Sequence, residues 1–220
     1  MVRVKICGIT NLGDARAACN AGAAALGFNF YARSKRVVSP AAAWSIIRRL
    51  PPFVAPVGVF VNWDPRAVCA IAEALRLSSV QLHGDETPQQ LAACAKQIPA
   101  LKAFRVGPGF RMSALRHYSA ASAFLLDAAQ TGQYGGTGQT TDWAVAREAA
   151  RSRLIILSGG LTPENVAEAI RVVRPYAVDV ASGVESRPGR KDPGKVRAFL
   201  QEVERVSKSL AEEGRADFNR

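Results

Sequence analysis

A cysteine that follows a short predicted strand is the residue of this chain best suited to chemistry. The strand covers Val2–Ile6, and Cys7 and Gly8 come directly after it. Because side chains alternate along a strand, Lys5 and Cys7 share one of its faces. The thiolate is the reactive form, and only a few per cent of a free thiol with a pKa of about 8.5 is ionised at neutral pH. A base at Cys7 therefore needs a nearby positive charge, which Lys5 could supply.

Helix starts of one kind recur along the chain and set a repeat length. A capping side chain followed by proline at the first helical position is typical of a helix N-terminus. This pair occurs at Ser39-Pro40, Asp64-Pro65, Thr87-Pro88, Thr162-Pro163 and Asp192-Pro193. The successive intervals are 25, 23, 75 and 30 residues. The long interval holds three units, so the chain repeats a strand and a helix about every 25 residues.

Eight predicted strands alternate with the helices, which favours a parallel sheet. They cover Val2–Ile6, Ala24–Phe28, Pro56–Val61, Ser79–Leu82, Ala100–Val106, Ala123–Leu126, Leu154–Leu157 and Tyr176–Val180. The fold class expected is α/β, a single (β/α)8 TIM barrel over residues 1–209. The last helix is expected to end near Ser209, with a charged, frayed tail at 210–220. The alternative is a doubly wound open sheet, which rarely uses eight equal units without a Gly-rich dinucleotide turn.

Composition narrows the classes of partner. The formal net charge is +11, but the basic residues are spread along the chain and no aromatic residues are interleaved with them. We expect an anionic small-molecule substrate and no nucleic-acid partner, with a basic barrel that binds RNA or acts as a scaffold as the alternative from another class. No apolar run is long enough to span a bilayer and no signal segment is evident, so no membrane partner and a cytoplasmic location are expected. The spacing of the cysteines and histidines predicts no metal site.

In a (β/α)8 barrel the strand ends carry the active site, and here they carry polar residues and three glycine clusters. The candidates are Cys7, Arg36, His83, Arg105 and Asp127, with Arg105 and His83 as the weaker, substrate-lining ones. The glycine clusters supply Gly136, Thr137, Gly138, Ser158, Gly159, Gly160, Ser182 and Gly183. Their backbone N–H groups after strands six to eight predict a phosphate site. Cys7 and Asp127 can act as an acid/base pair, and proton transfer between two groups is the chemistry these residues support best.

The face that Cys7 shares with Lys5 predicts one further contact. We expect Lys5 to lie inside the barrel and to pair with Asp179 on the neighbouring eighth strand. Two outcomes stay open: Lys5 lowers the pKa of the Cys7 thiol, or it is satisfied by Asp179 alone and leaves that pKa unchanged.

The strand-end motifs together resemble those of the phosphoribosylanthranilate isomerase family of tryptophan biosynthesis. They are Lys5-Ile6-Cys7-Gly8-Ile9-Thr10, Gly27-Phe28, Ser34-Lys35-Arg36, Val57-Gly58-Val59-Phe60-Val61-Asn62, Gln81-Leu82-His83-Gly84-Asp85-Glu86, Leu125-Leu126-Asp127, Gly135-Gly136-Thr137-Gly138, Leu157-Ser158-Gly159-Gly160-Leu161 and Val180-Ala181-Ser182-Gly183-Val184-Glu185. They occur in order at every strand end from residue 4 to about residue 200, so the resemblance does not depend on any single motif.

The resemblance implies an Amadori rearrangement of N-(5-phosphoribosyl)anthranilate to 1-(2-carboxyphenylamino)-1-deoxyribulose 5-phosphate, without a cofactor. It implies Asp127 as the general acid, Cys7 as the general base, Arg36 as the partner of the anthranilate carboxylate, and the glycine clusters as the holders of the phosphate. It leaves a monomer or a homodimer open.

This chain departs from the family's pattern at two positions. The family's usual lysine after the Gly-Gly-Thr-Gly turn is Gln139 here, so that loop offers no charged phosphate contact. Ala181 stands where a serine is common. Related phosphosugar barrels fit less well: one would need a lysine and glutamates at the strand ends, another an aspartate on the first strand in place of Cys7, and a third several metal-binding histidines.

Overall fold

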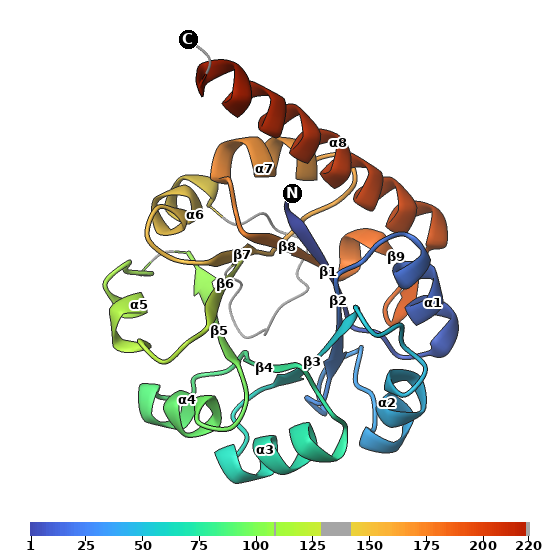
Figure 1. Ribbon diagram of the computed structural model, residues 1–220. Helices are drawn as coiled ribbons and strands as arrows, with labels where there is room; N and C mark the ends of the chain where they lie inside the picture. The colour runs from blue at the N-terminus through green and yellow to red at the C-terminus, as the bar shows by residue number, and fades with distance from the viewer. Residues whose placement is uncertain (108, 129–141, 219–220) are drawn as a thin grey trace.

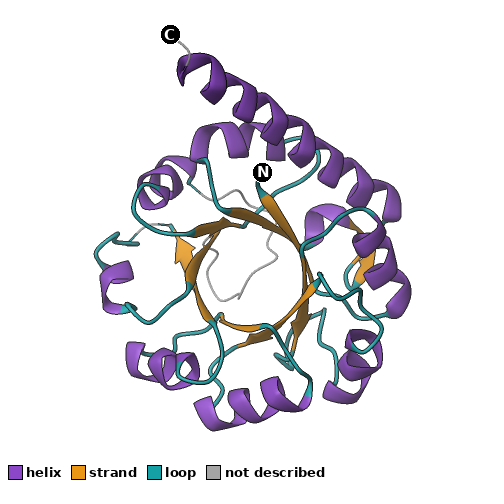
Figure 2. Ribbon diagram, viewed as in Figure 1, coloured by secondary structure: helices purple, strands orange, loops and turns teal. Residues whose placement is uncertain are grey.

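Eight parallel strands close into a barrel in the computed structural model, which describes residues 1–107, 109–128 and 142–218 (Figure 1). The strands are β1 (Arg3–Cys7), β2 (Ala25–Asn29), β3 (Ala55–Phe60), β4 (Ser79–Leu82), β5 (Ala100–Val106), β6 (Ala123–Ala128), β7 (Ile155–Leu157) and β8 (Ala177–Val180). Each pairs in parallel with the next, and β8 returns to β1. The helices surround this ring (Figure 2). The predicted (β/α)8 TIM barrel is confirmed, and the open sheet is excluded.

Four of the five predicted helix starts are confirmed. The helices are α1 (Leu12–Asn20), α2 (Pro40–Ile47), α3 (Pro65–Ala74), α4 (Pro88–Ala95), α5 (Ala114–His117), α6 (Trp143–Ala150), α7 (Val166–Val173) and α8 (Pro193–Phe218). Ser39, Asp64 and Thr87 accept from backbone N–H groups as N-caps. The predicted start at Thr162-Pro163 is wrong, because the Thr162 hydroxyl accepts from Glu164 N within a turn that precedes α7.

Helix α8 continues beyond Ser209, where the sequence predicted its end. Ala211, Glu212 and Glu213 are good helix formers, so nothing in their backbone preference stops the helix. Side-chain contacts also cross the predicted end, because Ser209 Oγ donates to Glu213 Oε1 at 3.1 Å and Arg174 lies 3.5 Å from the Glu213 carboxylate. The helix lies along α7 and α1 on the outside of the barrel (Figure 1).

A hairpin after β8 was not predicted. The short 3-10 helix η1 (Ser182–Val184) leads into β9 (Glu185–Arg187), which pairs antiparallel with β10 (Arg190–Lys191). The Pro188-Gly189 pair between the strands is a turn signal that sequence reasoning could have used. Thr10 Oγ1 donates to Gly189 O at 2.7 Å, and Lys191 N donates to Asp14 Oδ2 at 2.8 Å. These bonds hold the hairpin against the segment after β1.

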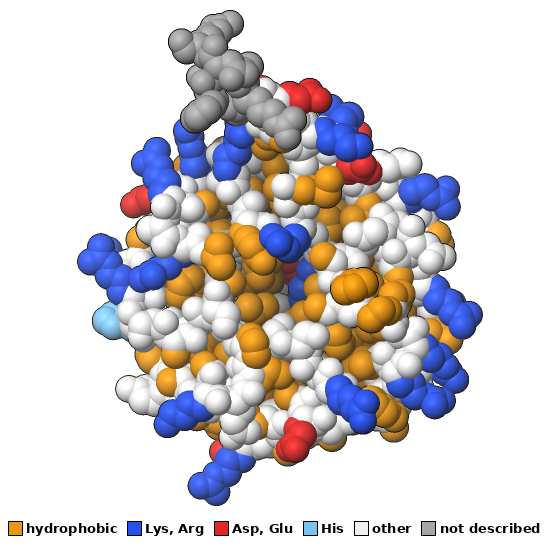
Figure 3. Space-filling view, in the orientation of Figure 1, with side chains coloured by type: hydrophobic (Ala, Val, Ile, Leu, Met, Phe, Trp, Pro, Cys, Tyr) orange, Lys and Arg blue, Asp and Glu red, His pale blue; other side chains and the backbone are white. Residues whose placement is uncertain are grey.

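The two faces of β1 point where the alternation predicted. Val4 and Ile6 are buried in the core between the barrel and its helices, while Lys5 is buried within the barrel. A small apolar layer fills the barrel interior and consists of Val57, Leu101, Ala103, Ala123, Leu125, Ile156 and Ala177. On the face drawn in Figure 3, most Lys and Arg side chains lie around the edge and some lie near the centre, and they form no single continuous patch.

Candidate active site

A cavity of about 580 Å³ opens at the C-terminal ends of the strands, and six of the ten predicted site residues that the structure describes line it. Its size falls within the usual range for small-molecule sites. Among the described residues, its lining includes Cys7, Arg36, His83, Asp127, Ser158 and Ser182. Four cationic residues also line this cavity: Arg33, Lys35, Arg36 and Arg187. The cavity therefore combines acid/base groups with a surplus of positive charge.

Two of the predicted glycines line a second, smaller depression, and two others lie outside the described residues. Gly159 and Gly160 line a depression that shares Asp127, Ser158, Ala181 and Ser182 with the main cavity. Gly183 packs too closely against Leu161 O for any side chain to fit. Gly136, Thr137, Gly138 and Gln139 lie outside the described residues. Arg105 is not among the described lining residues of either space; its guanidinium pairs with Asp85 at 2.6 Å.

The carboxyl end of β7 offers backbone donors for an anion. Gly159 and Gly160 adopt positive φ angles of 87° and 61°, which glycine tolerates without strain. No described residue accepts a hydrogen bond from their N–H groups. Asn165 Nδ2 donates to Gly160 O at 2.9 Å and keeps this turn in place. Backbone N–H groups in a glycine turn at the end of a strand can donate to an anion, so Gly159 and Gly160 are candidate donors.

Lys5 forms the ion pair that the sequence predicted. Its Nζ lies 2.7 Å from Asp179 Oδ1, and both side chains are only 5% exposed. Ser158 Oγ donates to the other carboxylate oxygen, Asp179 Oδ2, at 3.3 Å. Gly27 makes room for this arrangement on β2, because a Cβ there would lie 2.8 Å from Cys7 Sγ and 3.2 Å from Lys5 Cε. Strand pairing therefore places the thiol, the ammonium and the carboxylate side by side.

The Cys7 thiol is subject to opposing effects. Burial raises its pKa, because a thiolate is poorly solvated there. The Lys5 ammonium lowers the pKa and the Asp179 carboxylate raises it, so the ion pair acts on the thiol in both directions. Lys191 of the hairpin lowers it as well. For Lys5 itself, burial opposes the charge, but Asp179 and Cys7 outweigh that effect and raise its pKa.

Arg36 is held by a carboxylate that the sequence did not assign. Its Nε and Nη2 each donate to Glu185 at 2.8 Å, one to each oxygen. The Arg36 side chain also covers Gly8, whose φ of 77° and missing side chain leave it room. This bidentate pair fixes the plane of the guanidinium. The contact spans 149 residues in sequence, so only the folded hairpin reveals it.

Asp127 lies at the end of β6 beside the His83 ring. Its Oδ2 is 3.4 Å from His83 Nε2, and the Asp127 side chain is 4% exposed. Gln81 Nε2 lies 2.7 Å from His83 Nδ1, so a donating amide assigns the ring proton to Nε2, facing Asp127. His83 thus lies against the carboxyl group, although its Nε2 makes no hydrogen bond to a described residue.

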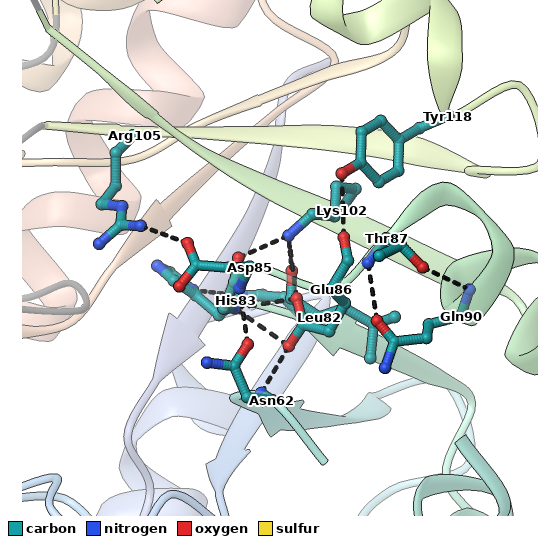
Figure 4. A network of polar contacts seen from close by, with 12 residues as sticks. Asn62, Leu82, His83, Asp85, Glu86, Thr87, Gln90, Lys102, Arg105 and Tyr118 are labelled. Atoms are coloured by element: carbon teal, nitrogen blue, oxygen red, sulfur yellow. Dashed lines mark hydrogen bonds and ion pairs between the residues drawn. The ribbon is translucent and has the colours of Figure 1, made fainter. Parts of the chain in front are cut away.

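A buried polar network supports the segment that carries His83 (Figure 4). Lys102 Nζ donates to Gly84 O at 2.8 Å and to Glu86 Oε2 at 2.9 Å. Glu86 Oε1 accepts from Asn62 N at 2.8 Å, and Tyr118 OH donates to the Glu86 carbonyl at 2.9 Å. Lys102 and Glu86 are each 2% exposed. The network joins the ends of β3, β4 and β5, and sequence reasoning gave it no role.

Replacement of Lys102 by methionine is expected to destabilise the protein by about 3–5 kcal/mol, because it leaves the Glu86 carboxylate buried without its cation. Urea denaturation monitored by circular dichroism measures the change. Lys96→Met, at an exposed position after α4, is the matched control and is expected to change stability by less than about 0.5 kcal/mol. If Lys102→Met is as stable as Lys96→Met, the buried Glu86 carboxylate does not require this ion pair.

No group of three or more His, Cys, Asp or Glu side chains within the described ranges could hold a metal ion. None of the described helices is both long enough and apolar enough to cross a membrane.

The fold and the position of the cavity define a class: a (β/α)8 barrel with its candidate active site at the carboxyl ends of the strands. The family model described as N-(5'-phosphoribosyl)anthranilate (PRA) isomerase matches residues 4–202 of the chain. The N-(5'-phosphoribosyl)anthranilate isomerase of Trichlorobacter lovleyi is 53% identical over 202 residues, which are 91% of this chain and 97% of that protein. The chain therefore belongs to the N-(5'-phosphoribosyl)anthranilate isomerase family.

Solved structures agree with the family. The crystal structure of phosphoribosyl anthranilate isomerase from Thermotoga maritima has a TM-score of 0.86 and 47% identity, covering 93% of this chain and 99% of that one. A second structure of such an isomerase, in complex with reduced 1-(o-carboxyphenylamino)-1-deoxyribulose 5-phosphate, has a TM-score of 0.83 and 44% identity over the same shares. A third describes mutually generated monomers of the dimeric Thermotoga maritima enzyme, with a TM-score of 0.83 and 43% identity over the same shares.

Proposed function

We propose that Asp127 and Cys7 carry the reaction of this isomerase as its acid and its base. The family's reaction is the isomerisation of N-(5'-phosphoribosyl)anthranilate in tryptophan biosynthesis, and the product is 1-(2-carboxyphenylamino)-1-deoxyribulose 5-phosphate. Asp127 gives its proton to the ribose ring oxygen, and the ring opens to a Schiff base. Cys7 then takes the proton from C2, the carbon next to the anomeric carbon. The resulting enolamine gains a proton at C1 and loses the proton of its C2 hydroxyl group, which leaves the ketone. The Cys7 thiol then releases the proton it took and Asp127 takes one up, so both groups are restored and the protons balance.

The observation that carries this proposal is that both groups line one cavity from different walls. Cys7 ends β1, and Asp127 ends β6, which is not a neighbour of β1 in the barrel. A sugar bound between them can present its ring oxygen to one group and its C2 hydrogen to the other. General acid/base catalysis requires that kind of placement before any matching of pKa values.

The two anionic ends of the substrate have separate partners in the proposal. The phosphate binds the turns of Gly159-Gly160 and Ser182-Gly183, and Gly136, Thr137 and Gly138 complete the site. The anthranilate carboxylate binds Arg36 through Nη1, because Glu185 already takes Nε and Nη2. A planar guanidinium suits a carboxylate partner on each edge. His83 orients Asp127, and Arg105 lies at the outer edge of the substrate's approach.

We also propose the remaining properties of the protein. Residues 1–209 form the catalytic unit, and residues 210–220 add nothing to the site. The enzyme works in the cytoplasm as a monomer or a homodimer, without a nucleic-acid or membrane partner and without a cofactor.

The wild-type protein is expected to convert phosphoribosylanthranilate, followed as the loss of anthranilate-type fluorescence. Arg36→Met is expected to raise KM about tenfold or more, because it removes a charged hydrogen bond to the carboxylate. Lys35→Met removes a rim cation of the same cavity that has no such role, and it serves as the matched control. Absence of turnover by the wild type would favour the alternative, a basic barrel that binds RNA. In that case the affinity of the protein for RNA would fall steeply as the salt concentration rises.

A further inference from the structure

Lys191 of the hairpin is a buried cation next to the catalytic cavity. Its side chain is fully buried, with 0% exposure. Its Nζ donates to Ala181 O at 2.9 Å and to Glu185 Oε1 at 3.0 Å. A buried ammonium is costly unless it is paired, so its position requires an explanation.

The position of Lys191 relates directly to Cys7. Strand β8 lies beside β1, with Val180 in register with Ile6. Ala181, which follows Val180 and accepts from Lys191, is therefore adjacent to Cys7, and both line the cavity. The Lys191 ammonium thus lies behind the wall that carries the thiol.

The charges around Cys7 do not cancel while the thiol is neutral. Lys5 is matched by Asp179 in an ion pair of 2.7 Å. The Glu185 carboxylate, in contrast, is shared by two cations, Arg36 and Lys191. Three cations and two carboxylates leave a net charge of +1 in this buried cluster. One additional negative charge, a thiolate at Cys7, makes the cluster neutral.

We propose that Lys191 is a positioning residue for the reaction, and that its unbalanced charge stabilises the Cys7 thiolate. The inference rests on the proposed role of Cys7 as the base. It assigns the unbalanced positive charge to Lys191 and not to Lys5, because the charge of Lys5 is matched by the Asp179 carboxylate. Glu185 has two tasks in this account: it orients Arg36, and it keeps Lys191 in place and charged.

The electrostatic effects on the cysteine agree with this account. Burial raises the pKa of Cys7 and outweighs the other effects; Lys5 lowers this pKa by its charge and by a hydrogen bond, Asp179 raises it, and Lys191 lowers it. Burial lowers the pKa of Lys191, but Glu185 and Cys7 oppose that effect and favour its charged form. Asp127 and His83 project from the ends of β6 and β4 across the barrel, and the cavity is also lined by Tyr31, Arg33, Lys35 and Arg187. The Asp14 carboxylate on α1 accepts from the Lys191 backbone N–H.

The test measures the rate at which iodoacetamide alkylates Cys7 as a function of pH, with the modified residue identified by mass spectrometry. Lys191→Met is expected to move the midpoint up by about one to two pH units, because the thiolate loses a nearby positive charge. Lys191→Arg keeps the charge and is expected to restore the wild-type midpoint. Lys195→Met removes an exposed lysine whose Nζ donates to the Glu185 carbonyl and not to its carboxylate, and the midpoint is expected to stay at the wild-type value.

A second variant gives a shift of opposite sign. Glu185→Gln removes a negative charge from the cluster, so the alkylation midpoint is expected to move down by about one pH unit, while KM rises as Arg36 loses its orientation. A purely structural role for the hairpin would not produce opposite shifts in the two variants. Unchanged midpoints in a folded Lys191→Met protein would overturn the proposal, and if that variant does not fold, an unchanged midpoint in Glu185→Gln would do so.

The alkylation experiment does not depend on turnover. If Cys7→Ala converts the substrate at the wild-type rate, the role of Cys7 as the base fails, whatever the alkylation midpoints are. If that variant is inactive and the midpoints do not move, the base assignment stands and the role of Lys191 fails.

Discussion

Replacement of Cys7 by alanine is expected to lower kcat by about 10²–10⁴-fold, the usual contribution of a positioned general base. KM is expected to change little, because the thiol contacts the substrate where a proton is removed and contributes little to ground-state binding. Steady-state fluorescence kinetics with phosphoribosylanthranilate measure both constants. The effect should be confined to catalysis, since Cys7 is only half-buried and its loss removes one sulfur atom.

The matched control is Cys19→Ala. Cys19 is also half-buried, but it lies on α1 and is not among the described residues that line the cavity. Its replacement is expected to leave kcat within about twofold of the wild type. Wild-type turnover by Cys7→Ala would remove the thiol from the mechanism.

Replacement of Asp127 by asparagine is expected to lower kcat by about 10²–10⁴-fold as well, for a different reason. The amide has nearly the same shape and can still contact His83, but it cannot give a proton to the ribose ring oxygen. Ring opening then becomes the slow step. The same fluorescence assay detects the loss, and a thermal melt checks that the folded state is unchanged.

Asp85→Asn is the control for this change. Asp85 is an exposed aspartate that pairs with Arg105, and it is not among the described lining residues of the cavity. Its replacement is expected to leave kcat within about twofold of the wild type. If Asp127→Asn turned over at the rate of this control, the acid would have to be another group.

Local signals were sufficient to predict the barrel. Proline after a capping side chain marked the starts of four of the eight described α-helices, and alternation along β1 separated Lys5 and Cys7 from Val4 and Ile6. Those signals act over a few residues. Because all strands of a parallel barrel end on the same side, predicting each strand also predicts that its last residues lie at the active-site end. The same signal failed at Thr162, where a hydroxyl that could cap a helix stabilises a turn instead.

The supporting contacts of the site could not be predicted in the same way. The Lys5–Asp179 pair followed from strand order, because β8 must lie beside β1 in a closed barrel. The contacts of Glu185 with Arg36 and Lys191 depend on how a hairpin folds back over the rim, and no periodicity in the sequence encodes that. The pairing of Glu185 with Arg36 and Lys191 is therefore visible only in the folded structure.

The rate at which deuterium is lost from C2 of the substrate tests most directly the central claim, which is that Cys7 is the base. The substrate is labelled with deuterium at C2 of its ribose, and the loss of the label is followed by mass spectrometry in wild type, Cys7→Ala and Asp127→Asn. The account predicts that the wild type releases the label during turnover, and that Cys7→Ala retains it for at least about 10² times longer. Release of the label by Cys7→Ala at the wild-type rate would contradict the assignment of Cys7 as the base.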